Sequence, residues 1–231
     1  MDIIELSVEF AYEEQPYFIY PSLIVLENKE LALVDTGYPG FLPLIESAIE
    51  QKGYDIGQLK YIVITHYDDD HIGALHDFKE KYPWVTVISS EREAVYISGE
   101  EKSERLEQAE ALLAQMPEEQ KAFGQSFVEL LTRLRHIPVD QTVRDGEWLF
   151  GGACKVMATP GHTSGHISLY LPELDSVITG DAAYSEANGT ELLVANPQYC
   201  LDLPQAEKSL ELLKSLKAKH YYCYHGGSLH I

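Results

Sequence analysis

The sequence predicts an α/β fold in which two packed β-sheets lie between outer layers of helices, an αββα sandwich. Short β-rich runs fill both the N-terminal and the C-terminal parts of the chain. Each β-rich part is followed by a helical pattern, as expected when helices cover the outer faces of two sheets. A helical segment at residues 91–137 separates the two parts, and we interpret it as an insertion. With 231 residues the chain can bury a substantial core, so we expect one domain over 1–231.

The N-terminal part alternates β-rich runs with turn residues. The predicted elements are strands at 3–10, 18–26 and 30–35, a helix at 41–52, a strand at 61–65, a helix at 72–82 and a strand at 85–89. The run at 61–65 reads YIVIT and is largely apolar, which is typical of a strand buried on both faces. The loop that follows it is therefore expected to start from the interior of the protein.

The segment 91–137 is rich in Glu, Gln and Leu, and Pro117 divides it. Apolar residues at helical spacing predict a helix on each side of the proline. The two apolar faces consist of Leu106, Ala109, Leu113 and Met116, and of Phe123, Phe127, Leu130, Leu131 and Leu134. Such a segment can cap an active site, pack against the body of the protein or form a contact in a homodimer, and the sequence leaves these roles open.

The C-terminal part returns to β character. The predicted elements are strands at 147–150, 153–158, 167–171 and 176–179, a helix at 203–217 and a last strand at 220–224. Asp202 suits the N-cap of the helix and Pro204 its first turn. This second set of strands followed by a helix repeats the plan of the N-terminal part.

The charge balance bears on the partners of the protein. Lys and Arg number 17 and Asp and Glu 37, a formal net charge of −20. Such a surface repels phosphate backbones and anionic membranes, so we expect a small-molecule substrate and neither nucleic acid nor a membrane as partner. The N-terminus has no signal-peptide pattern, and Cys154, Cys200 and Cys223 are too sparse for a disulfide framework. We therefore expect a cytoplasmic protein.

The segment 65–71 reads Thr-His-Tyr-Asp-Asp-Asp-His and directly follows a predicted buried strand. A loop can point alternate side chains inward, and His66, Asp68 and Asp70 are spaced by two. His71 starts the next predicted helix. Imidazole and carboxylate groups are the ligands that hold Zn²⁺, Fe or Mn in hydrolytic sites. The competing interpretation is an acidic surface loop that happens to contain histidine.

Three later segments favour the metal site. The sequence TPGHTSGH contains His162, ITGD ends in Asp181, and YHGG contains His225. Each of these residues lies just past a predicted strand, where loops gather into a site. A single histidine is more often structural, but four strand ends that all offer metal-type ligands are hard to explain in that way. We interpret His166, four residues after His162, as a supporting or packing residue.

Together these motifs resemble those of the metallo-β-lactamase superfamily, and most of all its glyoxalase II and N-acyl-homoserine-lactonase branches. The leading family motif, His-x-His-x-Asp-His, here runs from His66 to His71, and TPGHTSGH, ITGD and YHGG follow in order. Asp35 matches an early aspartate that usually supports the metal loop. The resemblance covers essentially the whole chain and implies the αββα metallo-β-lactamase fold.

The resemblance implies a hydrolase with two divalent cations, Zn²⁺ in the first place and Mn or Fe as alternatives. The implied ligands are His66, Asp68 and His162 for the first cation, Asp70, His71 and His225 for the second, and Asp181 between them. A hydroxide between the cations would attack a small ester, thioester or lactone. Asp70 would also orient this hydroxide.

Asp68 departs from the family pattern, which usually has histidine at this position. A carboxylate is still a competent ligand, but it lowers the formal charge of the centre by one unit. This should weaken Lewis acidity and make the bound water less acidic. Oxygen ligation also shifts the preference toward Mn or Fe. Di-iron oxygen reductases of the flavodiiron type carry Glu here, and a DNA-uptake-associated branch carries Asp.

Several further residues are candidates for supporting roles. Tyr184 follows Asp181 closely and can bond a substrate oxyanion if it points into the cleft; Tyr67 is a weaker candidate for the same role. We expect His76 to be exposed or structural and His220 to lie in the core. Cys223 is expected to be a buried structural thiol.

Four functions compete. Hydrolysis of an ester, thioester or lactone leads. An iron-dependent oxidoreductase on the same fold would use the carboxylate of Asp68, although the chain shows no flavodoxin-like part. A small-molecule phosphodiesterase is the third alternative. The fourth, a non-catalytic binding protein, would tolerate lost ligands, whereas every ligand position here holds a ligand-type residue.

Overall fold

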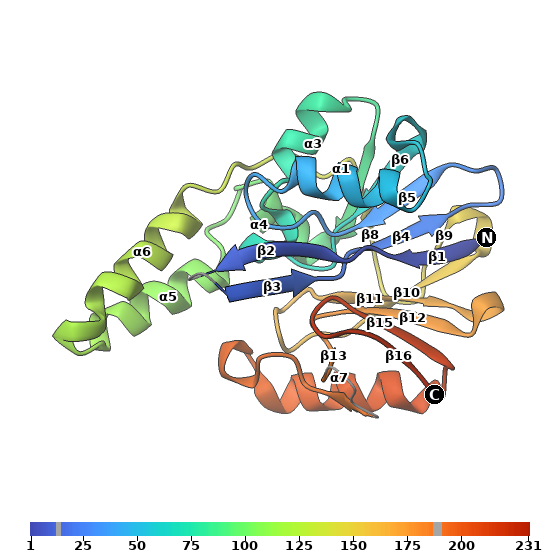
Figure 1. Ribbon diagram of the computed structural model, residues 1–231. Coiled ribbons are helices and arrows are strands. Elements are labelled where there is room, and N and C mark those ends of the chain that lie inside the picture. The colour runs from blue at the N-terminus through green and yellow to red at the C-terminus, as the bar shows by residue number, and fades with distance from the viewer. Residues whose placement is uncertain (13–14, 187–190) are drawn as a thin grey trace.

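The computed structural model describes residues 1–12, 15–186 and 191–231 and contains the four predicted layers (Figure 1). Two six-stranded sheets pack face to face. Helices α1 (Leu42–Gln51) and α3 (Leu75–Lys81) cover the outer face of the first sheet. Helix α7 (Leu203–Ser215) covers the second. The αββα fold predicted from the sequence is therefore confirmed.

The first sheet comes from the N-terminal part of the chain and has the order β1-β4-β5-β6-β7-β8. Its strands are β1 (Asp2–Glu5), β4 (Ser22–Val25), β5 (Leu31–Val34), β6 (Leu59–Val63), β7 (Thr86–Ser90) and β8 (Gln141–Val143). From β5 to β8 neighbouring strands are parallel, so their carboxyl ends meet at the same edge of the sheet. The loops that carry Asp35 and His66 start from this edge.

The second sheet has the order β16-β15-β12-β11-β10-β9. Its strands are β9 (Trp148–Leu149), β10 (Cys154–Ala158), β11 (Ile167–Leu171), β12 (Ser176–Gly180), β15 (His220–Cys223) and β16 (Gly227–His230). Neighbours are antiparallel except for the parallel pair β12 and β15. This pair ends at one edge, so Asp181 and His225, which follow the two strands, start from neighbouring positions.

Strand β5 shows why the interior runs are apolar throughout. Successive side chains of a strand point to opposite faces. Ala32 and Val34 belong to the apolar cluster between the two sheets, whereas Leu31 and Leu33 belong to the cluster beneath α1 and α3. All four are at most 1% exposed. A strand that serves two cores needs an apolar residue at every position, which is the pattern of the sequence LALV.

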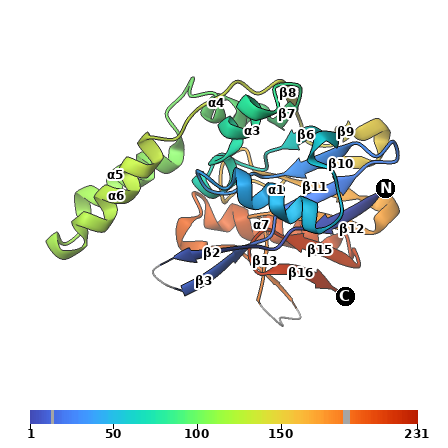
Figure 2. The ribbon, with the colours of Figure 1, turned by 45° about the horizontal axis from the view of Figure 1, so that its top comes forward.

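The insertion consists of α4 (Glu91–Ile97), α5 (Glu104–Gln115) and α6 (Lys121–Thr132). Helices α5 and α6 form a hairpin that projects from the body of the protein in both views (Figures 1 and 2). The turn between them contains Pro117, the residue at which the sequence predicted the division. Helix α4, by contrast, lies beside β7 and β8 in the body of the protein.

Two predicted strands are each divided in the structure. The run at 3–10 forms β1 and β2 (Val8–Tyr12), and the run at 18–26 is replaced by β3 (Gln15–Ile19) and β4. Strands β2 and β3 pair with each other as a separate hairpin. The division occurs where the Leu6 amide donates to the Pro21 carbonyl at 2.9 Å. This bond keeps the register between the two pairs, in which Glu5 is opposite Ser22 and Val8 is opposite Ile19.

Several elements are too short to show a sequence pattern and were not predicted. They are strands β8, β13 (Tyr184–Ser185), β14 (Leu192–Leu193) and β16, the helix α2 (Asp69–Ile72), and the 3-10 turns η1 (Ile56–Gln58), η2 (Glu118–Gln120), η3 (Phe150–Gly152), η4 (Pro172–Leu174) and η5 (Pro197–Tyr199). Helix α2 starts inside the ligand motif, three residues before the predicted helix start.

The cysteines form no disulfide, as expected from their spacing. Cys154 and Cys223 are buried, and burial raises the pKa of each thiol to about 12. Cys223 is therefore the structural thiol that the sequence predicted. Within the described part of the chain, every helix is too short or too polar to span a membrane.

Candidate metal centre

All seven predicted ligand residues meet at one edge of the two sheets. They come from four loops, which follow β6, β10, β12 and β15. Their ligand atoms form three overlapping groups, each with all atoms within 4.8 Å of one another. The groups are His66, His71 and Asp181; His66, Asp68 and His162; and Asp70, His71 and His225. The structure thus brings together the residues that the sequence placed on separate strand ends.

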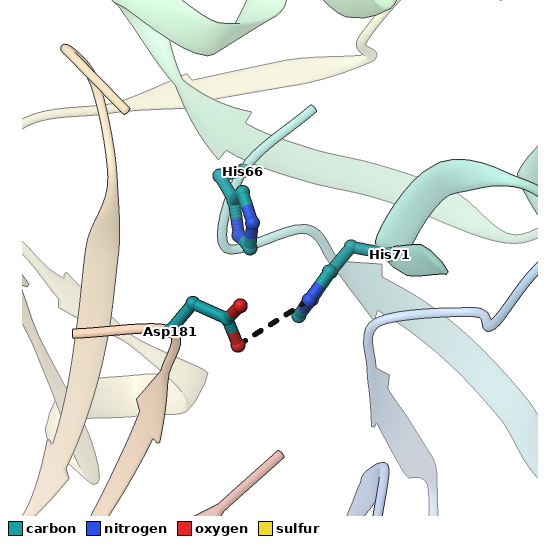
Figure 3. A group of neighbouring side chains, drawn as sticks. All are labelled: His66, His71 and Asp181. Carbon is teal, nitrogen blue, oxygen red and sulfur yellow. Dashed lines mark ion pairs between the residues drawn. The ribbon is translucent and has the colours of Figure 1, made fainter. Parts of the chain in front are cut away.

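Asp181 lies between the two sets of ligands. Figure 3 shows His66, His71 and Asp181 pointing toward a common space, with Asp181 Oδ1 3.4 Å from His71 Nε2. The other oxygen, Oδ2, lies 3.5 Å from the Nε2 atoms of both His162 and His225. The carboxylate therefore faces ligands of both predicted cations.

The spacing of the ligand atoms suits a metal ion. Asp68 Oδ2 lies 3.1 Å from His162 Nε2 and 3.5 Å from His66 Nε2. Asp70 Oδ2 lies 3.1 Å from His225 Nε2 and 3.6 Å from His71 Nε2. Tetrahedral ligands about 2.0–2.2 Å from Zn²⁺ are separated from one another by roughly 3.3–3.6 Å. The separations of 3.5 and 3.6 Å fall in this range, and the two of 3.1 Å are slightly shorter.

Three buried atoms at the centre of the cluster find no hydrogen-bond partner among the described residues. They are His66 Nε2, His71 Nε2 and Asp181 Oδ1. A buried polar atom without a partner costs about 1–3 kcal/mol, so such atoms are rare and call for an explanation. Cations bound among these residues would satisfy all three atoms. The donor set therefore fits a divalent metal.

Asp35 fixes the orientation of two of these histidines. It is 1% exposed and follows β5. Its Oδ1 accepts from the Thr65 amide, and its Oδ2 accepts from Thr65 Oγ1, both at 2.8 Å, and from His71 Nδ1 at 2.9 Å. Thr65 Oγ1 in turn lies 3.0 Å from His66 Nδ1. With Nδ1 protonated in both rings, each Nε2 lone pair faces the centre, which confirms the supporting role expected of Asp35.

His166 supports the centre and is not one of its ligands, as interpreted from the sequence. Its Nε2 accepts from the Asp181 amide at 2.9 Å, and its Nδ1 lies 2.8 Å from Thr159 Oγ1. Burial holds the pKa of this imidazole well below its usual range, so the ring is neutral. Gly180 has φ +53° and a side chain there would approach His166 Nε2 to 2.7 Å, which explains the glycine of ITGD.

Glu93 is a supporting residue that the sequence did not reveal. It is fully buried on α4. Its Oε2 accepts from the Tyr67 amide at 2.9 Å, and its Oε1 accepts from Thr163 Oγ1 at 2.7 Å and from the Gly165 amide at 2.9 Å. One carboxylate thus joins the two loops that carry His66 and His162. A glutamate in an acidic helical segment resembles a solvated surface residue, so the sequence contained no signal for it.

We expect Glu93→Gln to lower the free energy of unfolding by about 1–3 kcal/mol. Three donors point at this carboxylate, and an amide would turn a further donor toward them. Denaturant unfolding followed by circular dichroism measures the change. Glu91→Gln, at an exposed position of the same helix, is the matched control and should change little. Equal stability of the two variants would contradict the bracing role of Glu93.

Arg105 is the second residue that the sequence did not reveal. It lies on α5, is 3% exposed, and its Nη2 is 2.8 Å from Asp68 Oδ2. Burial by itself would raise the pKa of Asp68, but Arg105 and the neighbouring His162 and His66 rings hold it well below its usual range. An arginine in a helix rich in Glu and Gln is usually solvated, so spacing alone did not single it out.

The two tyrosine candidates do not reach the cleft. Tyr67 is buried, and its hydroxyl accepts from the Arg105 amide at 3.2 Å, so it faces α5. The oxyanion role considered for Tyr67 is therefore wrong. Tyr184 packs against Gly226, where an added side-chain carbon would meet the tyrosine ring at 3.1 Å. It does not line the cavity beside the ligands, and its predicted catalytic role finds no support in the geometry.

The remaining histidines lie outside the cluster. His76 is half-buried on α3, 3.9 Å from Glu80, in agreement with the expected structural role. His220 is a correction: it is only half-buried, and its Nδ1 lies 2.7 Å from Nδ1 of His230. Strand β15 alternates, so Tyr221 and Cys223 are buried whereas His220 and Tyr222 on the other face are half-buried.

A cavity of about 470 Å³ opens beside the ligand cluster. Asp68, Asp70, His162 and Asp181 line its inner end. Apolar side chains of the α5–α6 hairpin line the rest, among them Leu112, Met116, Phe123, Phe127 and Leu130. The hairpin therefore forms one wall of the cavity, whereas α4 packs against the body of the protein. A contact in a homodimer stays a prediction.

Comparisons with known proteins agree with this geometry. The family profile described as "Metallo-beta-lactamase superfamily" matches residues 16–225. The probable metallo-hydrolase YflN of Bacillus subtilis is 32% identical over 181 residues, which cover 77% of this chain and 62% of the relative. Hydroxyacylglutathione hydrolase of Brucella ovis is 29% identical over 164 residues, covering 70% and 47%. The matches thus span less than two thirds of either relative.

A similar fold occurs among solved structures. The metallo-beta-lactamase family protein TTHA1429 from Thermus thermophilus superposes with a TM-score of 0.73 at 24% sequence identity. The superposition covers 99% of this chain and 74% of that protein. At this level of identity the likeness concerns the fold alone.

Proposed function

This chain belongs to the metallo-β-lactamase superfamily, and on that basis we propose that it is a metal-dependent hydrolase of a small ester, thioester or lactone. One observation carries the proposal: three buried ligand atoms without partners point into a common space beside a substrate-sized cavity. The names of two relatives, a probable metallo-hydrolase and a hydroxyacylglutathione hydrolase, support it.

In this proposal the seven clustered residues hold two divalent cations. The first ion would be bound by His66, Asp68 and His162, the second by Asp70, His71 and His225, and Asp181 would contact both. When bound, the cations would polarise the substrate carbonyl and lower the pKa of a water molecule. Burial opposes ionisation of Asp70, but His71 and His225 hold its pKa below the usual value. Asp70 can therefore accept a hydrogen bond from the attacking water and orient it.

The cavity supports a substrate with an apolar portion. Its inner end carries the carboxylates of Asp68, Asp69, Asp70 and Asp181, whereas the hairpin side is apolar. We propose that the scissile carbonyl lies at the inner end and that an acyl or alkyl group packs against α5 and α6. Burial of such a group stabilises the complex by about 25 cal/mol per Å² of apolar surface.

We expect Phe127→Ala to reduce kcat/KM about tenfold for p-nitrophenyl octanoate and much less for the acetate, because only the longer chain reaches the hairpin. Steady-state kinetics with both esters measure the difference. Leu212→Ala removes a 42% exposed apolar side chain from α7, away from the cavity, and should leave both rates unchanged. Equal losses for the two esters in Phe127→Ala would argue against acyl binding on the hairpin.

Elemental analysis of the purified protein, together with a screen of chromogenic esters, thioesters and lactones, tests the proposed function. About two equivalents of Zn or Mn with hydrolytic turnover would support it. Tightly bound iron without hydrolysis would favour the iron-dependent oxidoreductase. Turnover restricted to phosphodiesters would favour the phosphodiesterase, and a protein that binds no metal after reconstitution would refute the metal centre.

A further inference from the structure

Helix α5 brings a buried arginine to the most acidic part of the protein interior. Three ionised carboxylates, of Asp68, Asp70 and Asp181, line the inner end of the cavity, and Asp69 lies beside them. Among the described residues that line the cavity, Arg105 is the one that carries a permanent positive charge. Carboxylates in a poorly solvated site need such compensation, because burying an unpaired charge is very costly.

The guanidinium of Arg105 binds Asp68 with two of its nitrogens. Nε lies 3.1 Å from Oδ1 and 3.2 Å from Oδ2, and Nη2 lies 2.8 Å from Oδ2. The third nitrogen, Nη1, donates to Gln108 Oε1 at 2.6 Å and to the Tyr199 carbonyl. All three nitrogens are thus engaged, and the side chain is held in one orientation. The planar guanidinium thus makes a bidentate contact with the carboxylate, which the single ammonium group of lysine cannot make.

The same contact sets the position of the ligand atom. Asp68 Oδ2 accepts from Arg105 and also faces the Nε2 atoms of His162 and His66, at 3.1 and 3.5 Å. The bidentate contact fixes the plane of the carboxylate, so Oδ2 faces the two histidines as the third member of their group. Among the described partners of Asp68, Arg105 is the one whose charge does not depend on protonation, whereas His162, 3.1 Å away, is positive only when its ring is protonated.

We propose that Arg105 is a positioning residue that neutralises Asp68 and holds its Oδ2 in place as a metal ligand. The pair has no net charge, so Asp68 contributes an oxygen atom without making the centre more negative. The sequence alone predicted that Asp68 lowers the formal charge of the metal centre by one unit, and the positive charge of Arg105 offsets that change. The pairing also makes the insertion part of the metal centre, because Arg105 comes from α5. The inference rests on the proposed metal site.

Thermal unfolding of the 231-residue chain, as purified and after treatment with a chelator, tests the pairing. We expect Arg105→Gln to lower the midpoint by on the order of 10 °C, because it leaves Asp68 as an uncompensated buried charge. Adding Asp68→Asn to that variant should raise the midpoint again. In the wild-type background the same Asp68→Asn should lower it, because it leaves the guanidinium without its counter-ion.

This reversal of sign separates charge compensation from simple packing. If Arg105 only packed the hairpin, Asp68→Asn would have the same sign in both backgrounds, and that result would overturn the proposal. Arg92→Gln is the matched control: Arg92 lies on α4, is half-exposed and pairs with Glu101 and Glu104. Its midpoint should stay within about 2 °C of the wild type. If Arg92→Gln lowered the unfolding midpoint as much as Arg105→Gln, that result would also overturn the proposal.

A second variant keeps the test decisive if Arg105→Gln fails to fold. Arg105→Lys keeps the positive charge but loses the two parallel hydrogen bonds to Asp68. We therefore expect it to lower the unfolding midpoint less than Arg105→Gln does. Adding Asp68→Asn to Arg105→Lys should lower the midpoint further. A higher unfolding midpoint after Asp68→Asn is added to Arg105→Lys would contradict charge pairing. None of these measurements needs a bound metal or a substrate. A chain that binds no metal would therefore refute the proposed function without deciding the pairing, which the melting data decide independently.

Discussion

Asp181→Asn is expected to abolish hydrolysis and to reduce the bound metal from about two equivalents to one or fewer. Asp181 faces ligands of both cations through its two oxygens. Burial opposes its ionisation, but His225 and His71 hold its pKa well below the usual range, so the carboxylate is charged. An asparagine is neutral and replaces one of the two oxygens by an NH₂ group, which cannot coordinate a cation.

The size of the effect distinguishes a ligand from a supporting residue. Loss of a group that only orients a ligand costs about 10–100-fold in affinity or activity, so loss of a shared ligand should exceed about 100-fold. Metal content by elemental analysis and turnover with a chromogenic ester measure it, and circular dichroism confirms that the variant is folded. Asp175→Asn is the control, since Asp175 has φ +50°, which asparagine tolerates, and pairs with Lys219 at the surface. Metal content and turnover equal to those of the control would refute the assignment of Asp181.

Asp35→Asn is expected to weaken Zn²⁺ binding by about 10–100-fold and to lower the free energy of unfolding by about 1–3 kcal/mol. Asp35 is an acceptor for the Thr65 amide, the Thr65 hydroxyl and His71 Nδ1. The amide group of asparagine would face a donor at one of these positions. The His71 ring can avoid that clash by moving its proton to Nε2, which removes the lone pair from the metal centre.

Competition with a metallochromic indicator measures Zn²⁺ affinity, and denaturant unfolding measures stability. The control is Asp55→Asn: Asp55 accepts from the Gly57 amide at 2.8 Å at the exposed start of η1. Asparagine is an equally good cap at such a position, so neither quantity should change by much. Wild-type affinity in Asp35→Asn would show that the orientation of His71 does not depend on this carboxylate.

Local sequence patterns were enough to predict the fold and to select the residues that cluster. The apolar runs LALV and YIVIT predict interior strands because such strands are buried on both faces. Ligand-type residues directly after predicted strands were expected to converge, and His66, His162, Asp181 and His225 do so. A strand end is a local feature, and parallel strands carry such ends to the same edge of a sheet.

The boundaries of short elements could not be read in the same way. The interruption between β1 and β2 falls inside one β-rich run, so the local pattern did not mark it. Strand β16 starts at the second of two glycines and has four residues, too few to show a period. His220 was assigned to the core, but its side chain is half-buried and lies beside His230. Pairing between segments decides such details, and a run of a few residues does not reveal it.

The electrostatic character of the centre was decided by the tertiary structure. The sequence by itself determined that Asp68 stands among the ligand-type residues, and counting charges along the motif made the centre more negative. The structure places Arg105, 37 residues further along the chain, against this carboxylate. Likewise it places Glu93 against Thr163, 70 residues away. The sequence pattern identifies which groups can coordinate a metal, whereas only the packing of the insertion determines which charges surround them, because the energy of a buried charge depends on its neighbours in space.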